Sequence, residues 1–227
     1  MERARQTRGV FVYRNIADLQ AIMNYAEQEG VKGGRAAVVG GGLLGLEAAK
    51  AVYDLYIFCW SIVILKTHSN LCSPTIPDVT IINRQKYPLS RQIDSDAGEM
   101  VLHAIQAMGV QVLTSVSVQE ITTTRSDSGD EVFVGMDLTN GTHVEAVLVI
   151  FAIGTTPRDD LAKNSGINCH ARGGVVVGDD LTTSAKDVYA IGECANWRGN
   201  TYGLIGPGGQ SLLAFVKAPP KSESFCS

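Results

Sequence analysis

The sequence predicts an α/β protein: a Rossmann-like parallel sheet with an antiparallel β-meander. Three observations support this prediction. A short apolar strand runs through a glycine-rich turn at residues 40–45 directly into a helix. From that strand to residue 113, strands and helices alternate as β-α-β-α-β, the order of a doubly wound sheet. A stretch rich in hairpin signals follows.

The first elements lie around the glycine turn. Residues 9–14 are typical of a short strand, and residues 16–28 place apolar side chains at helical spacing before Gly30 ends the helix. Small apolar residues at 36–39 form the next strand, and the glycine-turn unit extends from residue 35 to about 54.

Two further strands and a helix complete the parallel unit. Residues 78–83 predict a strand, residues 94–108 an amphipathic helix that stops at Gly109, and residues 110–113 a third strand. The chain then changes character. The expected meander has strands at 116–124, 131–138 and 143–151, joined by turns at 126–130 and Asn140–Gly141. Short strands are expected at 174–177 and 187–191.

The turn has the G-x-G-x-x-G spacing, with a separate physical role for each glycine. Gly40 permits the tight turn, Gly42 lets the backbone approach a pyrophosphate, and Gly45 lets the helix pack closely on the strand. Free N–H groups and the helix dipole then hold phosphate charge, whereas the alternative is a purely structural turn. The predicted phosphate-binding residues are Gly40, Gly41, Gly42, Leu43, Leu44 and Gly45.

Composition excludes several classes. The net charge of −4 gives no reason to expect a nucleic-acid partner, and the five cysteines show no metal-site or redox-pair spacing. The polar N-terminus is not a secretory signal, so a reducing, cytoplasmic location fits best. The longest apolar run, residues 55–65, has about half the roughly 20 residues of a membrane span, so no membrane partner is expected.

The end of the second strand favours NADPH over NADH. NAD-specific sites place a carboxylate there for the ribose hydroxyls, whereas NADP-specific sites use Arg near the 2′-phosphate. This chain has Asn83 and Arg84, with Lys86 and Arg91 nearby and no competing carboxylate. The alternative is that Arg84 is only a solvated charge at a strand end.

Several separated motifs resemble the pyridine nucleotide-disulfide oxidoreductase family of flavoproteins. Within it, the chain is most similar to the flavin module of fungal assimilatory NAD(P)H-nitrite reductases, over about residues 9–54 and 78–208. The motifs lie at 36–49, 87–94, 148–157, 183–198 and 201–204.

The resemblance implies an FAD domain interrupted by an NAD(P)H domain, and a homodimer in the intact family. Gly154 would lie where the chain returns to the FAD domain. Gly192 and Glu193 would contact the FAD ribityl and pyrophosphate, followed by a helix N-terminus; an ordinary buried strand and turn is the alternative. Glu47 would approach the nicotinamide, or be an early-helix carboxylate. The implied segments are 1–33 (partial FAD domain and connecting helix), 34–150 (NAD(P)H domain), 151–208 (remaining FAD part) and 209–227 (divergent tail).

The chain also departs from the family pattern. It starts after the N-terminal FAD motif and lacks the iron–sulfur and siroheme regions, so we expect a fragment in which FAD binding is in doubt. Residues 55–77 are surplus, either a retained intron or an inserted lid. Three functions stay open: a nitrite-reductase-like NADPH–FAD module, a rubredoxin or ferredoxin reductase-like enzyme, and a non-enzymatic NADPH-binding fragment.

Overall fold

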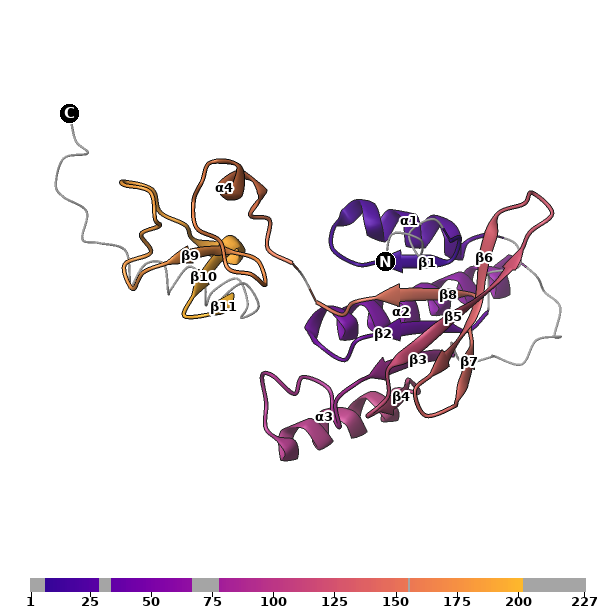
Figure 1. Cartoon of the computed structure of the whole chain (residues 1–227). Helices are drawn as coiled ribbons and strands as arrows, with labels where there is room; N and C mark the ends of the chain where they lie inside the picture. The colour runs from indigo at the N-terminus through magenta and orange to yellow at the C-terminus, as the bar shows by residue number, and fades with distance from the viewer. Residues whose placement is uncertain (1–6, 29–33, 67–77, 155, 202–227) are drawn as a thin grey trace. The chain divides into compact units, whose positions relative to one another are not determined.

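The computed structural model describes residues 7–28, 34–66, 78–154 and 156–201 of the 227-residue chain, with residues 55–66 described as helix only. The chain divides into two compact units, Met1–Gly154 and Thr155–Ser227 (Figure 1). Each unit has its own sheet and core, so we describe them one after the other.

The first unit is built on a five-stranded parallel sheet in the order β1-β8-β2-β3-β4. Every residue of β2 and β3 is buried, as expected for central strands covered on both faces. In the register, Val38 pairs with Ile81 on one side and Ile150 on the other. The strands are β1 (Val10–Val12), β2 (Ala36–Val39), β3 (Val79–Asn83), β4 (Gln111–Thr114) and β8 (Leu148–Phe151).

Three helices supply one covering layer of this sheet (Figure 1). Asn15 and Asp94 cap α1 and α3, because their side chains accept hydrogen bonds from the N–H groups of Asp18 and Ala97. The helices are α1 (Ile16–Ala26), α2 (Leu43–Lys66) and α3 (Ser95–Ala107). Their buried residues form one core with alternate residues of the strands: Ile22, Tyr25, Ala48, Ala49, Val52 and Ile105 with Ala36, Val38, Val79, Ile81, Leu148 and Ile150.

An antiparallel sheet covers the opposite face. It has the order β5-β6-β7, with β5 at Val118–Arg125, β6 at Glu131–Leu138 and β7 at His143–Glu145. Side chains of β6 pack onto the other alternate residues of the parallel strands, with Phe133, Met136 and Leu138 meeting Ala37, Val39, Ile82 and Val149. The α/β architecture with a meander, expected from the sequence, is therefore confirmed.

The expected strand over 143–151 is wrong in detail, because two sheets share it. After β7, the N–H of Ala146 still bonds to Val134 of the meander, but the N–H of Val147 bonds to the carbonyl of Arg35. From Leu148 the chain is a strand of the parallel sheet. Its residues Leu148–Ile150 are buried on both faces, which a meander with a solvated face would not provide.

The N-terminal segment differs from the expected FAD-domain assignment of residues 1–33. Strand β1 pairs in parallel with β8, and the ring of Phe11 lies 5.3 Å from that of Tyr25 in α1. The backbone of Arg8 exchanges hydrogen bonds with Glu131 and Phe133 of β6. These contacts place the described part of this segment in the first unit.

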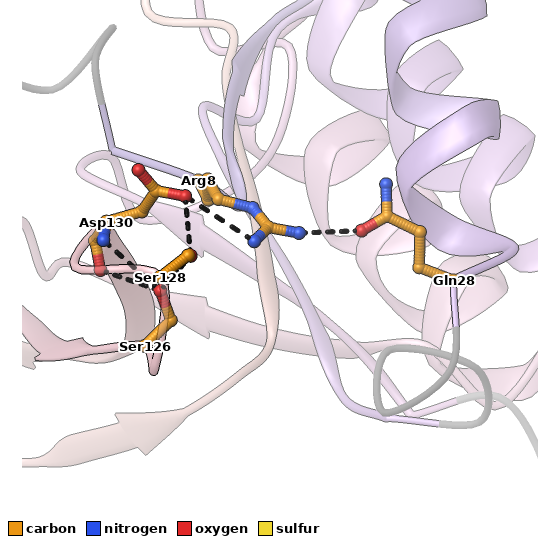
Figure 2. A network of polar contacts seen from close by, with 5 residues as sticks. All are labelled: Arg8, Gln28, Ser126, Ser128 and Asp130. Carbon is orange, nitrogen blue, oxygen red and sulfur yellow. Dashed lines mark hydrogen bonds and ion pairs between the residues drawn. The ribbon is translucent and has the colours of Figure 1, made fainter.

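The side chain of Arg8 adds a polar link across the same region (Figure 2). Its guanidinium donates to Gln28 at 2.9 Å and lies 3.8 Å from Asp130 in the β5–β6 turn. Within that turn the hydroxyl of Ser128 lies 2.8 Å from that of Ser126 and donates to Asp130 at 2.9 Å. Since these groups are exposed, the link orients the hairpin more than it stabilises the fold.

Helix α2 is longer than expected, because it runs to Lys66 rather than to about residue 54. No glycine or proline interrupts residues 46–66, so nothing in the sequence terminates the helix earlier. The remaining surplus residues, 67–77, lie outside the described residues. No helix in the described part of the chain is long and apolar enough to span a bilayer.

The second unit has a small sheet, β11-β10-β9, and a short helix α4 (Asp160–Asn164). Its core comprises Ala162, Val175, Val177, Leu181, Ala190 and Ala195. Strand β9 (Val175–Val177) matches the expected one, but residues 187–191 form only a bridge from Tyr189 to Thr182. The partner of β9 is instead β10 (Ala195–Trp197), followed by β11 (Asn200–Thr201).

Asp159 is a buried carboxylate that organises this unit. Its side chain is 5% exposed and accepts hydrogen bonds from Lys163 at 2.7 Å and from the N–H of Gly174 at 2.9 Å. The Lys163 hydrogen bond is the main cause that lowers the pKa of Asp159; burial opposes it and the Gly174 N–H reinforces it. The same bond raises the pKa of Lys163. Asp159 thus ties α4 to the turn before β9.

We predict that this pair makes the second unit acid-sensitive. A carboxyl whose pKa is lowered by folding stabilises the fold above its unfolded-state pKa, about 4, and that stability is lost as the pH falls through the folded value. The raised pKa of Lys163 means that its contribution disappears only at alkaline pH. Unfolding midpoints measured from neutral to acid pH should fall more steeply for the wild type than for Asp159→Asn. Parallel curves would contradict the role of Asp159.

Candidate coenzyme-binding site

The candidate site begins where β2 ends, at Gly40. Its N–H donates to the carbonyl of Ile82 at 2.9 Å, and its φ of 123° is one that residues with a Cβ rarely adopt. A Cβ on Gly40 would also overlap the carbonyl of Ala152, just after β8. The turn therefore lies at the point where the chain order reverses, between β2 and β8, where ligands bind in open α/β sheets.

Gly45 brings helix α2 onto this turn. A Cβ at this position would overlap the carbonyl oxygen of Gly40, so only glycine allows the first turn of the helix to approach so closely. The close packing expected for the third glycine of the motif is what the structure contains.

Gly42 has the opposite environment, because among the described residues no atom beyond its own turn lies within 4 Å of the place where its Cβ would be. The first helical hydrogen bond runs from the N–H of Leu46 to the carbonyl of Gly42, at 3.0 Å. The N–H groups of Leu43, Leu44 and Gly45 therefore belong to the helical turn that has no intrahelical acceptor. Open space next to such N–H groups fits a phosphate group.

The end of β3 meets the same turn. Asn83 is buried, and the Cβ position of Gly41 lies 2.7 Å from its Oδ1. The amide of Asn83 donates to the carbonyl of Gln85 at 3.0 Å, which holds the start of the following loop. The structure thus brings the glycine turn and the expected ribose-recognising strand end into contact.

Arg84 and Arg91 lie on this loop with exposed side chains, and so does Lys86. Within the described ranges, none of the three forms an ion pair with a carboxylate. The loop returns to the glycine turn through a 2.8 Å hydrogen bond from the N–H of Leu89 to the carbonyl of Gly41. Cations with no described carboxylate partner therefore lie on a loop that is bonded to the glycine turn.

The described contacts do not bring the remaining predicted site residues to the glycine turn. Glu47 is exposed on α2, and Gly154 is exposed at the end of the first unit. Gly192 and the exposed Glu193 lie in the second unit, in the 3-10 turn η2 (Gly192–Cys194). Their cofactor contacts stay predictions.

The helix expected after Glu193 is wrong. The 3-10 turn passes directly into β10, which pairs in parallel with β9. The buried side chain of Asn196, which donates to the carbonyl of Gly173 at 3.2 Å, helps hold this segment extended.

Sequence reasoning missed the contact of Tyr87 with Gly98. A Cβ on Gly98, inside α3, would overlap the Tyr87 ring. The signal was available, because glycine in a helix interior costs about 1 kcal/mol relative to alanine and so indicates a packing reason.

A model of the pyridine nucleotide-disulphide oxidoreductase family matches residues 4–211. The chain belongs to this family. The family binds FAD and NAD(P)H, which fits a dinucleotide site at the glycine turn.

The similar curated proteins include fungal nitrite reductases [NAD(P)H]. The Neurospora crassa protein is 45% identical over 91% of this chain, and the Emericella nidulans protein is 39% identical over 95%. The chain spans only 17% and 18% of the lengths of these two proteins. This family member therefore resembles a nitrite-reductase segment in sequence.

Among solved structures, a NAD-dependent persulfide reductase from A. fulgidus has a similar fold. The TM-score is 0.64 at 24% identity, over 85% of this chain and 30% of that one. The similarity supports the fold of this oxidoreductase-family chain.

We predict that alanine substitutions of Gly45 and Gly42 differ in their effect on stability. Gly45→Ala should destabilise the first unit by about 1–3 kcal/mol, because the added methyl group overlaps the Gly40 carbonyl. Gly42→Ala should change stability by no more than about 0.5 kcal/mol, because the added methyl group meets no described residue outside its own turn. Denaturant unfolding followed by circular dichroism measures both. Equal losses would show that Gly42 is also packed against protein.

Proposed function

We propose that the first unit binds NADPH, with its pyrophosphate at the N-terminus of α2. The observation that carries this proposal is the open space at Gly42, next to the N–H groups of the first helical turn. A Cβ there would meet no described residue outside its own turn, so the space is compatible with a bound group. The dipole of α2 favours an anion at this end.

The proposal extends to the choice of coenzyme. Asn83 occupies the strand end where a carboxylate would bind the ribose hydroxyls of NADH. Arg84, Lys86 and Arg91 offer positive charge for a 2′-phosphate, and Arg can bind it bidentately. A bound NADPH would gain from these cations, whereas NADH has no phosphate there.

For the whole chain, we propose part of an NAD(P)H-dependent flavoprotein reductase that acts in nitrite reduction. The identity to fungal nitrite reductases supports this substrate, and the family membership supports hydride transfer from the nicotinamide to FAD. In this proposal Glu47 faces the nicotinamide, while Gly154, Gly192 and Glu193 contribute to FAD binding. The protein would act in the cytoplasm, as a homodimer when intact.

The first test is coenzyme binding by the 227-residue chain. Fluorescence titration should show NADPH binding by the wild type, and Gly42→Ala should weaken it about tenfold or more, because the methyl group occupies the pyrophosphate space. Met100→Ala, at an exposed position of α3, is the matched control and should bind normally. A wild type that does not bind NADPH, or a Gly42→Ala variant with unchanged affinity, would refute the proposed site.

The second test concerns selectivity. Arg84→Ala should reduce NADPH affinity by roughly 10–100-fold, the value of a lost charge-assisted hydrogen bond, and leave NADH affinity nearly unchanged. Arg125→Ala removes an exposed arginine from β5 and serves as a control for net charge. The affinities for both coenzymes should be measured at one salt concentration, because salt screens exposed charges. Equal loss for both coenzymes would argue against 2′-phosphate recognition by Arg84.

A further inference from the structure

The loop after β3, residues 84–93, is fixed by hydrogen bonds of its backbone. The carbonyl of Gln85 accepts from the N–H of Ser115 and from the amide of Asn83, both at 3.0 Å. The N–H of Leu89, a residue with a φ of 57°, donates to Gly41 at 2.8 Å. The loop is therefore bonded to β3, to the end of β4 and to the glycine turn.

A side-chain contact fixes the middle of the loop from another direction. The half-buried ring of Tyr87 occupies the space that a Cβ of Gly98 would need, and the next residue, Pro88, is fully buried. Gly98 is itself buried in the first turn of α3 and has an ordinary helical backbone. Its lack of a side chain is therefore explained by the ring and not by a special dihedral angle.

This packing contrasts with the cations that flank it. Arg84 and Lys86 precede Tyr87, Arg91 follows it, and all three side chains are exposed. The described residues supply no carboxylate partner for them. The loop thus combines a fixed backbone with charged side chains that remain available to an anion.

We infer that Tyr87 and Gly98 are a positioning pair that sets coenzyme selectivity, through the loop that carries Arg84 and Arg91. The inference rests on the NADPH binding proposed above. Neither residue needs to touch the coenzyme. The ring seated on α3 holds the loop at the glycine turn, so the arginines meet a 2′-phosphate without first ordering the backbone.

The physical reason for selectivity is the entropy of the loop. A flexible loop must be ordered when its cations bind a phosphate, and this cost lowers affinity, whereas a preorganised loop avoids it. NADH lacks the 2′-phosphate and does not use these cations. Loosening the loop should therefore weaken NADPH binding and leave NADH binding almost unchanged.

Three variants of the full 227-residue chain test the pair. Tyr87→Ala removes the ring, and Gly98→Ala displaces it without removing it. We expect each to raise the Kd for NADPH about tenfold and to change the Kd for NADH by less than about twofold. Tyr87→Phe should behave like the wild type, because the described residues give the Tyr87 hydroxyl no hydrogen-bond partner and the ring is retained.

The two Kd values, taken with the unfolding midpoint of each variant, separate positioning from general stability. Equal weakening of both coenzymes by Tyr87→Ala and Gly98→Ala would overturn the inference and indicate a purely structural role. An unchanged preference for NADPH in the two variants would overturn it as well, while the proposed function would stand. If the wild type binds neither coenzyme, the proposed function fails, and this inference fails with it.

Discussion

The first unit depends on one close approach of backbone to backbone, at the turn between β2 and α2. The first turn of α2 lies against the carbonyl of Gly40, and Gly40 lies against Ala152 after β8. No side chain larger than hydrogen fits at Gly40 or Gly45 without moving these groups. This approach directs the start of the helix to the point where the strand order reverses.

This close approach of backbone to backbone also distinguishes the three glycines of the motif by their surroundings. The fold itself requires Gly40 and Gly45, because backbone atoms occupy the space that a Cβ would need at each position. It does not require Gly42, because no described residue outside its own turn lies within 4 Å of its Cβ position. Gly42 is the N-cap residue of α2, a position at which glycine is common. The motif therefore contains two glycines that the packing requires and one that it does not.

Local patterns in the sequence predicted most of the first unit, because its elements have local causes. The buried runs at β2 and β3 and the glycine spacing are short-range signals. The misassigned elements depend on distant partners. Residues 143–151 look like one strand, yet the chain changes sheets at Val147, because Arg35 and Gly9 supply the next acceptors. In the same way, no local signal predicts the pairing of β1, because its partner, β8, lies more than a hundred residues later.

The candidate site likewise combines residues that local patterns predict with a contact that depends on distant residues. The glycines were predicted from their spacing, and Asn83 and Arg84 from their place at a strand end. The contact of Tyr87 with Gly98 joins a loop to a helix and has no periodic signal. The folded unit gains nothing evident from placing Arg84, Lys86 and Arg91 on one short loop, since like charges repel and no described carboxylate offsets them. Yet the backbone beneath them is held by three hydrogen bonds and an aromatic ring seated on glycine. A loop that is fixed in position and carries cations with no described carboxylate partner has the two properties that recognition of an anion requires.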